Sequence, residues 1–229
     1  MSTEVKMAAA IHHLNVRRTA RYATIGEPGP HVSDVWIVCH GHAQLARKFI
    51  ERFRCIEAPD RLIVAPEALN RYYLDGGFHG AASRVGATWM TTEDREMEIA
   101  DYVAYLDDLY TEIFRGVPRP GCTLRILGFS QGVATAARWV VMGAAAPDQV
   151  VLWSGSLPAE LTPETAAKLS PAGRPLSVVV GDRDEYFTAK VIAAQRTTLE
   201  GLGVPFEVTT FAGGHEIDPA TLTGIAGKR

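Results

Sequence analysis

The chain has 229 residues, of which 47% are hydrophobic and 21% charged, and its formal net charge is −3. These values are ordinary for a globular protein, and this length accommodates one α/β domain or two small ones. The weak negative charge excludes nucleic acid and anionic membranes as expected partners. We expect a single domain over residues 1–229, with residues 1–19 as a loosely attached N-terminal segment.

The cysteine content and the N-terminal residues indicate where in the cell the protein is expected. Cys39, Cys55 and Cys122 show no paired spacing, and an odd, sparse set favours a reducing environment over a disulfide framework. The apolar patch at residues 7–11 is too short for a secretory signal or a membrane span. We therefore expect a cytoplasmic protein without stable membrane insertion. The sequence carries no signal for an oligomeric state.

Apolar runs alternate along the chain with segments of helical periodicity. Most of the runs are continuously apolar, which is typical of parallel strands covered by helices on both faces. The pattern predicts an α/β fold with a mostly parallel sheet. The expected strands cover residues 20–26 (an edge strand), 35–39, 62–65, 124–127, 149–153, 176–180 and 206–211. The expected helices cover residues 45–53, 133–145, 188–202 and 218–225, with a longer one from a Thr91 or Thr92 cap to residue 113 and a short one opening at residues 162–164.

Residues 67–90 show little periodicity, and we expect a long irregular loop there. Such loops are more often functional than mere connectors. This one carries Tyr72, Tyr73, Phe78 and Trp89. The aromatic side chains are expected to wall a substrate pocket, although core packing at a helix start is an equally good interpretation of Trp89.

The stretch from Gly128 to Gly132 has the pattern G-x-S-x-G, with an apolar strand before it and an alanine-rich helix after it. This context is that of a nucleophile elbow, in which a sharp turn lifts the serine above the strand end. Gly128 and Gly132 leave the room that the turn needs. The elbow makes Ser130 the candidate nucleophile and points the amide of Gln131 toward an oxyanion.

A serine nucleophile needs a base and a carboxylate that orients the base. Elbow enzymes place the acid and then the histidine after the serine, and His215 is the only histidine downstream of Ser130. Asp182 and Asp184 both follow the strand at 176–180, and either could serve as the acid. All these residues follow expected strands at their carboxyl ends, where sites of such sheets lie.

Five motifs between residue 35 and the C-terminus resemble a known family. They are Val38–Gly41, Ala65–Pro66, Gly128–Gly132, Gly181–Asp184 and Gly214–His215. The chain resembles the α/β-hydrolase superfamily, and within it the carboxylesterase, lysophospholipase and acyl-protein thioesterase group. The resemblance implies the α/β-hydrolase fold without a separate cap domain. It also implies Asp184 as the acid and the backbone amides of His42 and Gln131 as the oxyanion hole.

Two segments depart from this group. The usual H-G-L-G-D loop reads His40-Gly41-His42-Ala43-Gln44 here, so an imidazole borders the acyl site. His40-x-His42 could be interpreted as a metal site, but no third ligand with suitable spacing follows, and we expect neither metal nor cofactor. The usual D-P-x-V-P after the acid is replaced by Asp184-Glu185-Tyr186-Phe187.

The sequence therefore predicts a serine carboxylesterase that cleaves small to medium uncharged acyl esters through Ser130, His215 and Asp184. Hydrolysis of thioesters or lysophospholipids is the near alternative. A different class of function, a small-molecule receptor that retains the triad but turns over slowly, is also compatible with the fold.

Overall fold

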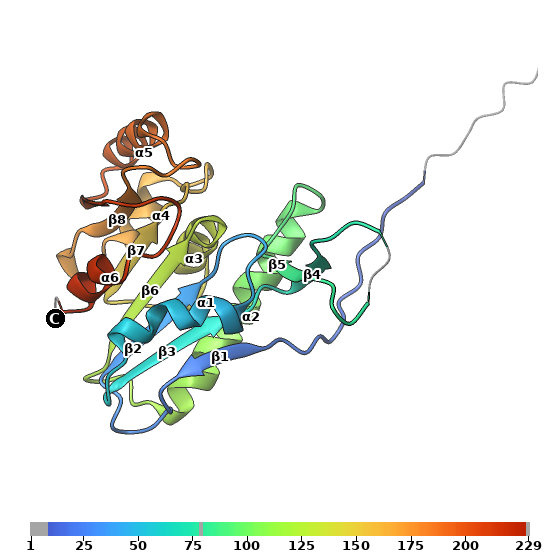
Figure 1. The fold of residues 1–229 in the computed structure, drawn as a ribbon, viewed down its shortest axis with the longest axis horizontal. Coiled ribbons are helices and arrows are strands. Elements are labelled where there is room, and N and C mark those ends of the chain that lie inside the picture. The colour runs from blue at the N-terminus through green and yellow to red at the C-terminus, as the bar shows by residue number, and fades with distance from the viewer. Residues whose placement is uncertain (1–8, 78–79, 228–229) are drawn as a thin grey trace, which may run out of the picture.

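The computed structural model describes residues 9–77 and 80–227 (Figure 1). Its strands are β1 (Tyr22–Ile25), β2 (Asp34–Cys39), β3 (Arg61–Pro66), β4 (Asn70–Tyr73), β5 (Val85–Thr88), β6 (Thr123–Phe129), β7 (Gln149–Trp153), β8 (Leu176–Gly181) and β9 (Phe206–Phe211). Seven of them form one sheet in the order β1-β3-β2-β6-β7-β8-β9. Only the edge strand β1 is antiparallel to its neighbour. The predicted mostly parallel sheet is confirmed.

Helices cover both faces of this sheet. They are α1 (Ala46–Phe49), α2 (Arg95–Gly116), α3 (Gln131–Met142), α4 (Pro163–Ala166), α5 (Ala189–Gly201) and α6 (Pro219–Ala226), with 3₁₀ segments η1 (Ile50–Ile56), η2 (Ala167–Leu169) and η3 (Pro171–Gly173). Buried side chains of α2, α3 and α5 share one hydrophobic cluster, whereas those of α1, η1 and α6 share another. Strand β2 contributes Val35 and Ile37 to the first cluster and Trp36 and Val38 to the second, because successive strand side chains point to opposite faces.

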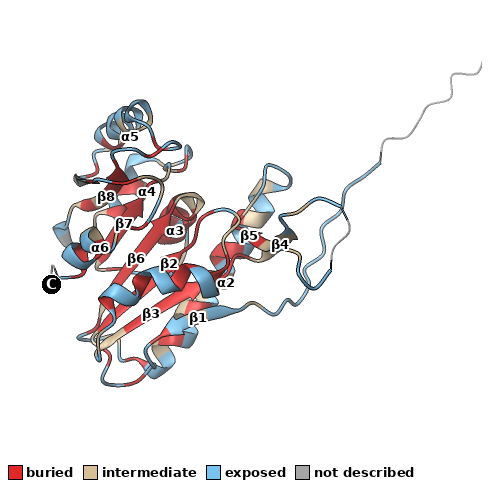
Figure 2. Cartoon of the chain, in the orientation of Figure 1, coloured by how far each residue is buried: buried red, intermediate tan, exposed pale blue. Residues whose placement is uncertain are grey.

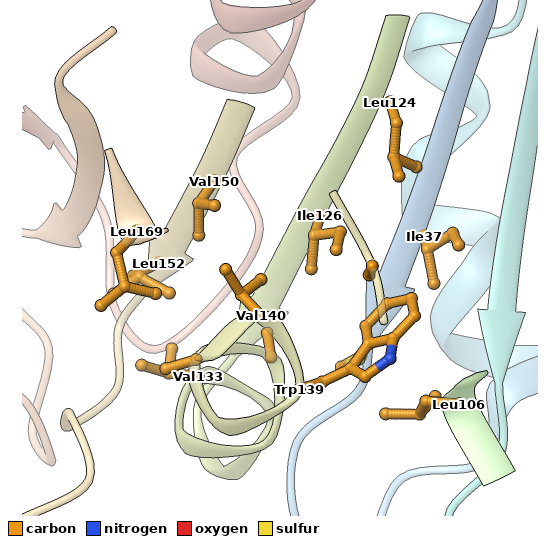
Figure 3. Packing of buried hydrophobic residues seen from close by; sticks show 14 of the residues in the cluster. Ile37, Leu106, Leu124, Ile126, Val133, Trp139, Val140, Val150, Leu152 and Leu169 are labelled. Atoms are coloured by element: carbon orange, nitrogen blue, oxygen red, sulfur yellow. The ribbon is translucent and has the colours of Figure 1, made fainter. Parts of the chain in front are cut away.

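Burial is concentrated in the central strands and the inward sides of the helices (Figure 2). Helix α3 lies on β6, and its fully buried Ala136 and Ala137 allow a close approach to the sheet. Trp139 of α3 packs in the same cluster as Leu106 of α2 and Ile126 of β6 (Figure 3). Within the described residues, no separate domain covers the carboxyl ends of the strands.

The segment at residues 67–90 corrects one expectation. It contains a small antiparallel hairpin of β4 and β5 rather than an irregular loop throughout. Each strand has only four residues, and β4 alternates between half-buried and exposed positions without an apolar run. Strands as short as these leave little periodic signal in the sequence. Phe78 lies outside the described residues.

Two helix starts also differ from the prediction. Helix α2 begins at Arg95 after Asp94, which has φ +48°, and neither Thr91 nor Thr92 is its cap. The helix expected from residue 45 is a single α-helical turn that continues as the 3₁₀ segment η1. The described part of the N-terminal segment, residues 9–21, is neither helix nor strand, and residues 1–8 lie outside the described residues. None of the described helices has the length and apolar character needed to cross a membrane.

A buried ionic cluster lies at the amino ends of the central strands. Asp34 of β2 accepts hydrogen bonds from Arg125 of β6 and, at 2.6 Å, from Arg61 Nε of β3. The side chain of Arg125 is only 1% exposed, and burial lowers its pKa although Asp34 acts in the opposite direction. Arg125 also lies over the ring of Trp36 at 5.2 Å. The carboxylate of Asp34 therefore compensates two buried guanidinium groups on neighbouring strands.

Replacing Asp34 with alanine should lower the free energy of unfolding by about 3–5 kcal/mol, because it removes the carboxylate that both Arg61 and Arg125 contact. Urea unfolding of the wild type and Asp34→Ala measures this difference. Asp101→Ala, at an exposed position on α2, is the control and should change stability by less than about 0.5 kcal/mol. A loss no larger than that of the control would show that the cluster is not needed for stability.

Candidate active site

The carboxyl ends of four strands bring the candidate residues to one edge of the sheet. His40 follows β2, Ser130 follows β6, Asp184 follows β8 and His215 follows β9. Because β2, β6, β7, β8 and β9 are consecutive in the sheet, their following loops lie along a single edge. This edge is where parallel α/β sheets place their sites.

Ser130 occupies a strained turn between β6 and α3. Its φ and ψ are +54° and −120°, a conformation that non-glycine residues rarely adopt. A Cβ atom on Gly128 would overlap the carbonyl oxygen of Gly132, and one on Gly132 would overlap that of Cys39. The amide of Ser130 donates to the Trp153 carbonyl at 2.9 Å. The two glycines thus occupy the positions where the elbow needs them.

His215 pairs with Asp184. The Nδ1 atom of His215 lies 2.8 Å from Oδ2 of Asp184, whose side chain is fully buried, while the His215 side chain remains 21% exposed. The imidazole ring lies 4.8 Å from the ring of Phe129, the residue before Ser130, and Tyr186 contacts it edge-on at 5.0 Å. The pair is therefore held beside the elbow with the imidazole partly exposed to solvent.

Several donors hold Asp184 in its ionised form. Its Oδ1 accepts from the amides of Tyr186 and Phe187 at 2.9 and 2.8 Å. Burial raises the pKa of this carboxyl, but the hydrogen bonds from His215, the Phe187 amide and neighbouring groups outweigh burial and lower the pKa below its ordinary value. The structure therefore favours the carboxylate form of Asp184.

The two aspartates left open by the sequence have different partners. Asp182 is half-exposed, and its Oδ1 accepts from the amide of Gly213 at 3.0 Å. That contact braces the turn before His215, but the aspartate that contacts the imidazole is Asp184. Asp182 therefore acts on the backbone of the loop, as short polar side chains in turns commonly do.

His40 is a structural residue of the β2–α1 loop, residues 40–45. Its Nε2 accepts from the Ala68 amide at 3.0 Å, so its Nδ1 carries the proton and donates to the Gly41 carbonyl at 2.7 Å. Burial lowers the pKa of His40 to about 4. Both ring nitrogens are used, and the described residues contain no group of three or more His, Cys, Asp or Glu able to hold a metal ion.

The same loop lies against the elbow and leaves one amide available. A Cβ atom on Gly41 would come within 3.1 Å of Ser130 Cβ. The amides of Gly41, Ala43 and Gln44 all donate hydrogen bonds within the protein. Among the described residues, the amides of His42 and of Gln131, at the start of α3, have no acceptor. His42 follows Gly41, which lies against Ser130, and Gln131 follows Ser130 in the chain.

The expected pocket residues lie in different surroundings. Tyr72 of β4 has its hydroxyl 2.7 Å from His42 Nε2, and the two rings lie 5.6 Å apart in a tilted arrangement. Tyr73, the next residue, is 50% exposed. Trp89 is only 1% exposed, and its Nε1 donates to the His40 carbonyl at 2.9 Å. The structure therefore places Trp89 in the core beneath the loop and Tyr72 at the rim beside His42.

Gln131 contributes more than its amide. Its side-chain Nε2 donates to the Met90 carbonyl at 3.0 Å and its Oε1 accepts from the Trp89 amide at 3.2 Å. The elbow glutamine thus attaches the end of β5 to the start of α3. A glutamine between Ser130 and Gly132 is the sequence feature behind this contact, but the sequence does not show which segment it reaches.

Three further residues of this edge were not predicted. Tyr186 stands edge-on to His215 and is 74% exposed. Ser154 follows β7 with φ +50°, and its buried hydroxyl makes no well-formed hydrogen bond to the described residues while contributing to the low pKa of Asp184. Glu67 is a buried carboxylate directly after β3. Their only sequence signal is a position immediately after a strand or after Asp184.

Comparisons with solved structures decide the fold family. Esterase PE8 superposes with a TM-score of 0.64 at 22% identity, covering 91% of this chain and 97% of that chain. Acyl-protein thioesterase 2 of Zea mays gives 0.66 at 18% identity, with coverages of 91% and 96%. The carboxylesterase of Bacillus cereus gives 0.62 at 12% identity, with coverages of 90% and 92%. The chain has the α/β-hydrolase fold.

At these identities the similarity establishes the α/β-hydrolase fold and leaves the chemistry to the residues themselves. The sequence matches no protein-family model, and a search of curated proteins finds no match either. The fold expected from the five sequence motifs is confirmed by the structural similarity.

The buried His40 should make stability depend on pH. Its pKa falls from 6.5 to about 4 on folding, so the unfolded chain binds the proton more strongly and stability is lost as pH falls through this range. The full loss from this group is about 3 kcal/mol. Urea unfolding across this pH range should show a steeper decline for the wild type than for His40→Gln, which keeps an acceptor for the Ala68 amide. Parallel declines would contradict the assignment of a buried neutral His40.

Proposed function

We propose that this α/β-hydrolase is a serine carboxylesterase that uses Ser130, His215 and Asp184 as a catalytic triad. The observation that carries the proposal is the His215–Asp184 hydrogen bond of 2.8 Å beside a serine held at φ +54°. Strain of this kind persists only where the surrounding structure enforces it, and it is concentrated at active sites. An ordinary strand-to-helix connection would need neither the strain nor the buried carboxylate.

The hydrogen bond to Asp184 sets the role of each imidazole nitrogen. Because Nδ1 donates to the carboxylate, Nε2 of His215 is the basic nitrogen and accepts the Ser130 proton as Oγ attacks the ester carbonyl. The resulting imidazolium then donates that proton to the leaving alcohol. Water attacks the acyl-enzyme with the same assistance, releases the carboxylic acid and restores Ser130.

The negative charge that develops on the carbonyl oxygen needs donors that are already in place. The free amides of His42 and Gln131 are the proposed oxyanion hole. Gln131 is the first residue of α3, so its amide also carries the partial positive charge of a helix N-terminus. Donors of this kind act without reorganisation during the reaction and are worth about 3–4 kcal/mol each.

The proposed substrates are small to medium uncharged acyl esters. Half-exposed Tyr72 beside His42 and exposed Tyr186 beside His215 give an aromatic rim at a site that stays accessible from solvent. Thioester hydrolysis is the second candidate, because the similar maize structure is an acyl-protein thioesterase. The mechanism requires no cofactor, and three free cysteines fit the proposed cytoplasmic location.

Ser130→Ala should abolish multiple turnover of p-nitrophenyl esters, with a loss of at least about 10⁴-fold in kcat. Assays with esters of increasing acyl length, for the wild type and the variant, measure this loss and the size of the acyl site. Equal rates in both proteins would exclude Ser130 as the nucleophile. Acylation of the wild type in a single turnover without further turnover would favour the slow receptor over the esterase.

The two aspartates allow a matched test of the acid. Asp184→Asn should lower kcat by about 10³–10⁴-fold, because an amide no longer stabilises the imidazolium or its tautomer. Asp182→Asn lies two residues away on the same loop and should retain activity within about threefold, since its oxygen can still accept from the Gly213 amide. The reverse order of effects would assign the acid to Asp182.

A further inference from the structure

The two residues that follow β3 contact both ends of the β2–α1 loop. The Ala68 amide donates to Nε2 of His40, at the start of the loop, at 3.0 Å. At the other end, Oε2 of Glu67 accepts from the amide of Ala46, the first residue of α1, at 3.2 Å. Glu67 and Ala68 therefore contact both ends of the loop that carries the His42 amide.

Glu67 is engaged on both carboxylate oxygens. Its side chain is 1% exposed, and its Oε1 accepts from Arg21 Nε at 2.5 Å and from Arg71 Nη1 at 3.2 Å. Burial raises the pKa of this carboxyl, but the two arginines outweigh burial and lower it below the ordinary value. Both arginines reach solvent, with side chains 53% and 39% exposed, so the buried charge is neutralised without burying a cation.

Arg71 connects Glu67 to the hairpin, and the hairpin in turn contacts the β2–α1 loop. Arg71 of β4 pairs in the hairpin with Ala87 of β5. The Ala87 carbonyl accepts from the Ala43 amide at 2.9 Å, and its amide donates to the Gln44 carbonyl at 3.2 Å. Glu67 thus connects the hairpin, through Arg71, to the same loop that Ala87 contacts directly.

We propose that Glu67 is a positioning residue for the oxyanion hole, which fixes the β2–α1 loop against the hairpin so that the His42 amide faces the Ser130 site. This role rests on the proposed esterase function. Glu67 does not touch the reacting atoms. It acts through Ala46 and Arg71, on either side of the loop, and sets the place of an amide donor that is preorganised before the substrate binds.

The expected effect is on the chemical step. A donor displaced by about 1 Å loses much of its stabilisation of the transition state, so Glu67→Ala should lower kcat by about 10–100-fold. KM should stay within about twofold, because the ground-state carbonyl depends little on this donor. Glu67→Gln keeps one oxygen for the Ala46 amide and should retain kcat within about fivefold of the wild type.

Asp148 offers a matched control. Its Oδ2 also accepts from an arginine, Arg119, at 3.1 Å and from a backbone amide, that of Leu124, at 2.7 Å. It precedes β7 at the opposite end of the sheet. Asp148→Ala removes the same kinds of contact and should leave kcat within about twofold of the wild type.

The experiment measures kcat and KM with p-nitrophenyl acetate and amide hydrogen exchange of residues 40–46 for these four proteins. A lower kcat at unchanged KM in Glu67→Ala, with faster exchange confined to this loop and the adjoining hairpin, supports the proposal. Unchanged kcat overturns it. So does faster exchange throughout the chain, which would mark a general loss of stability. An inactive wild type would defeat the proposed function, whereas unchanged loop exchange in Glu67→Ala would defeat the positioning role alone.

Discussion

The turn at Ser130 requires three backbone segments to come closer than any side chain allows. β6 enters the turn, α3 leaves it, and the end of β2 passes beside it, with the Cys39 carbonyl against Gly132. Gly155, after β7, likewise lies against the Ser130 carbonyl, where a Cβ atom would overlap it. The loops that carry His215, Asp184 and His42, the residues proposed as base, acid and oxyanion donor, all lie at the same edge of the sheet as this contact. A methyl group at any of these glycines would separate the elements that form the site.

The sheet and most of its helices could be predicted because their residues follow simple periodicities. β7 has the bounds expected from its apolar run, and β9 does too. Arg125 is the exception within a strand that otherwise looks continuously apolar, since its burial depends on Asp34 and Arg61 from neighbouring strands. No local pattern contains that information, because the partners lie far away along the chain.

Local motifs in the sequence identified the residues of the candidate site, and the structure showed which of them contact one another. Two aspartates two residues apart look alike in a sequence, and only the fold shows that Asp184 faces His215 while Asp182 faces Gly213. The hairpin at residues 67–90 was not predicted, because its strands have only four residues each and their contacts with the β2–α1 loop and the Gln131 side chain involve segments distant in the sequence. Glu67 was missed for the same reason: its partners come from three separate segments.

Strand β5 of the hairpin packs on the core through Ala87, and polar contacts of Arg71 and Gln131 attach its base, while Tyr73 and Leu74 are exposed. Its outer residues contribute little to the free energy of unfolding. Substitutions and length changes at these outer residues should therefore cost the fold little. For protein engineering, the same division makes the exposed residues of the hairpin a natural place for substitutions on an unchanged scaffold.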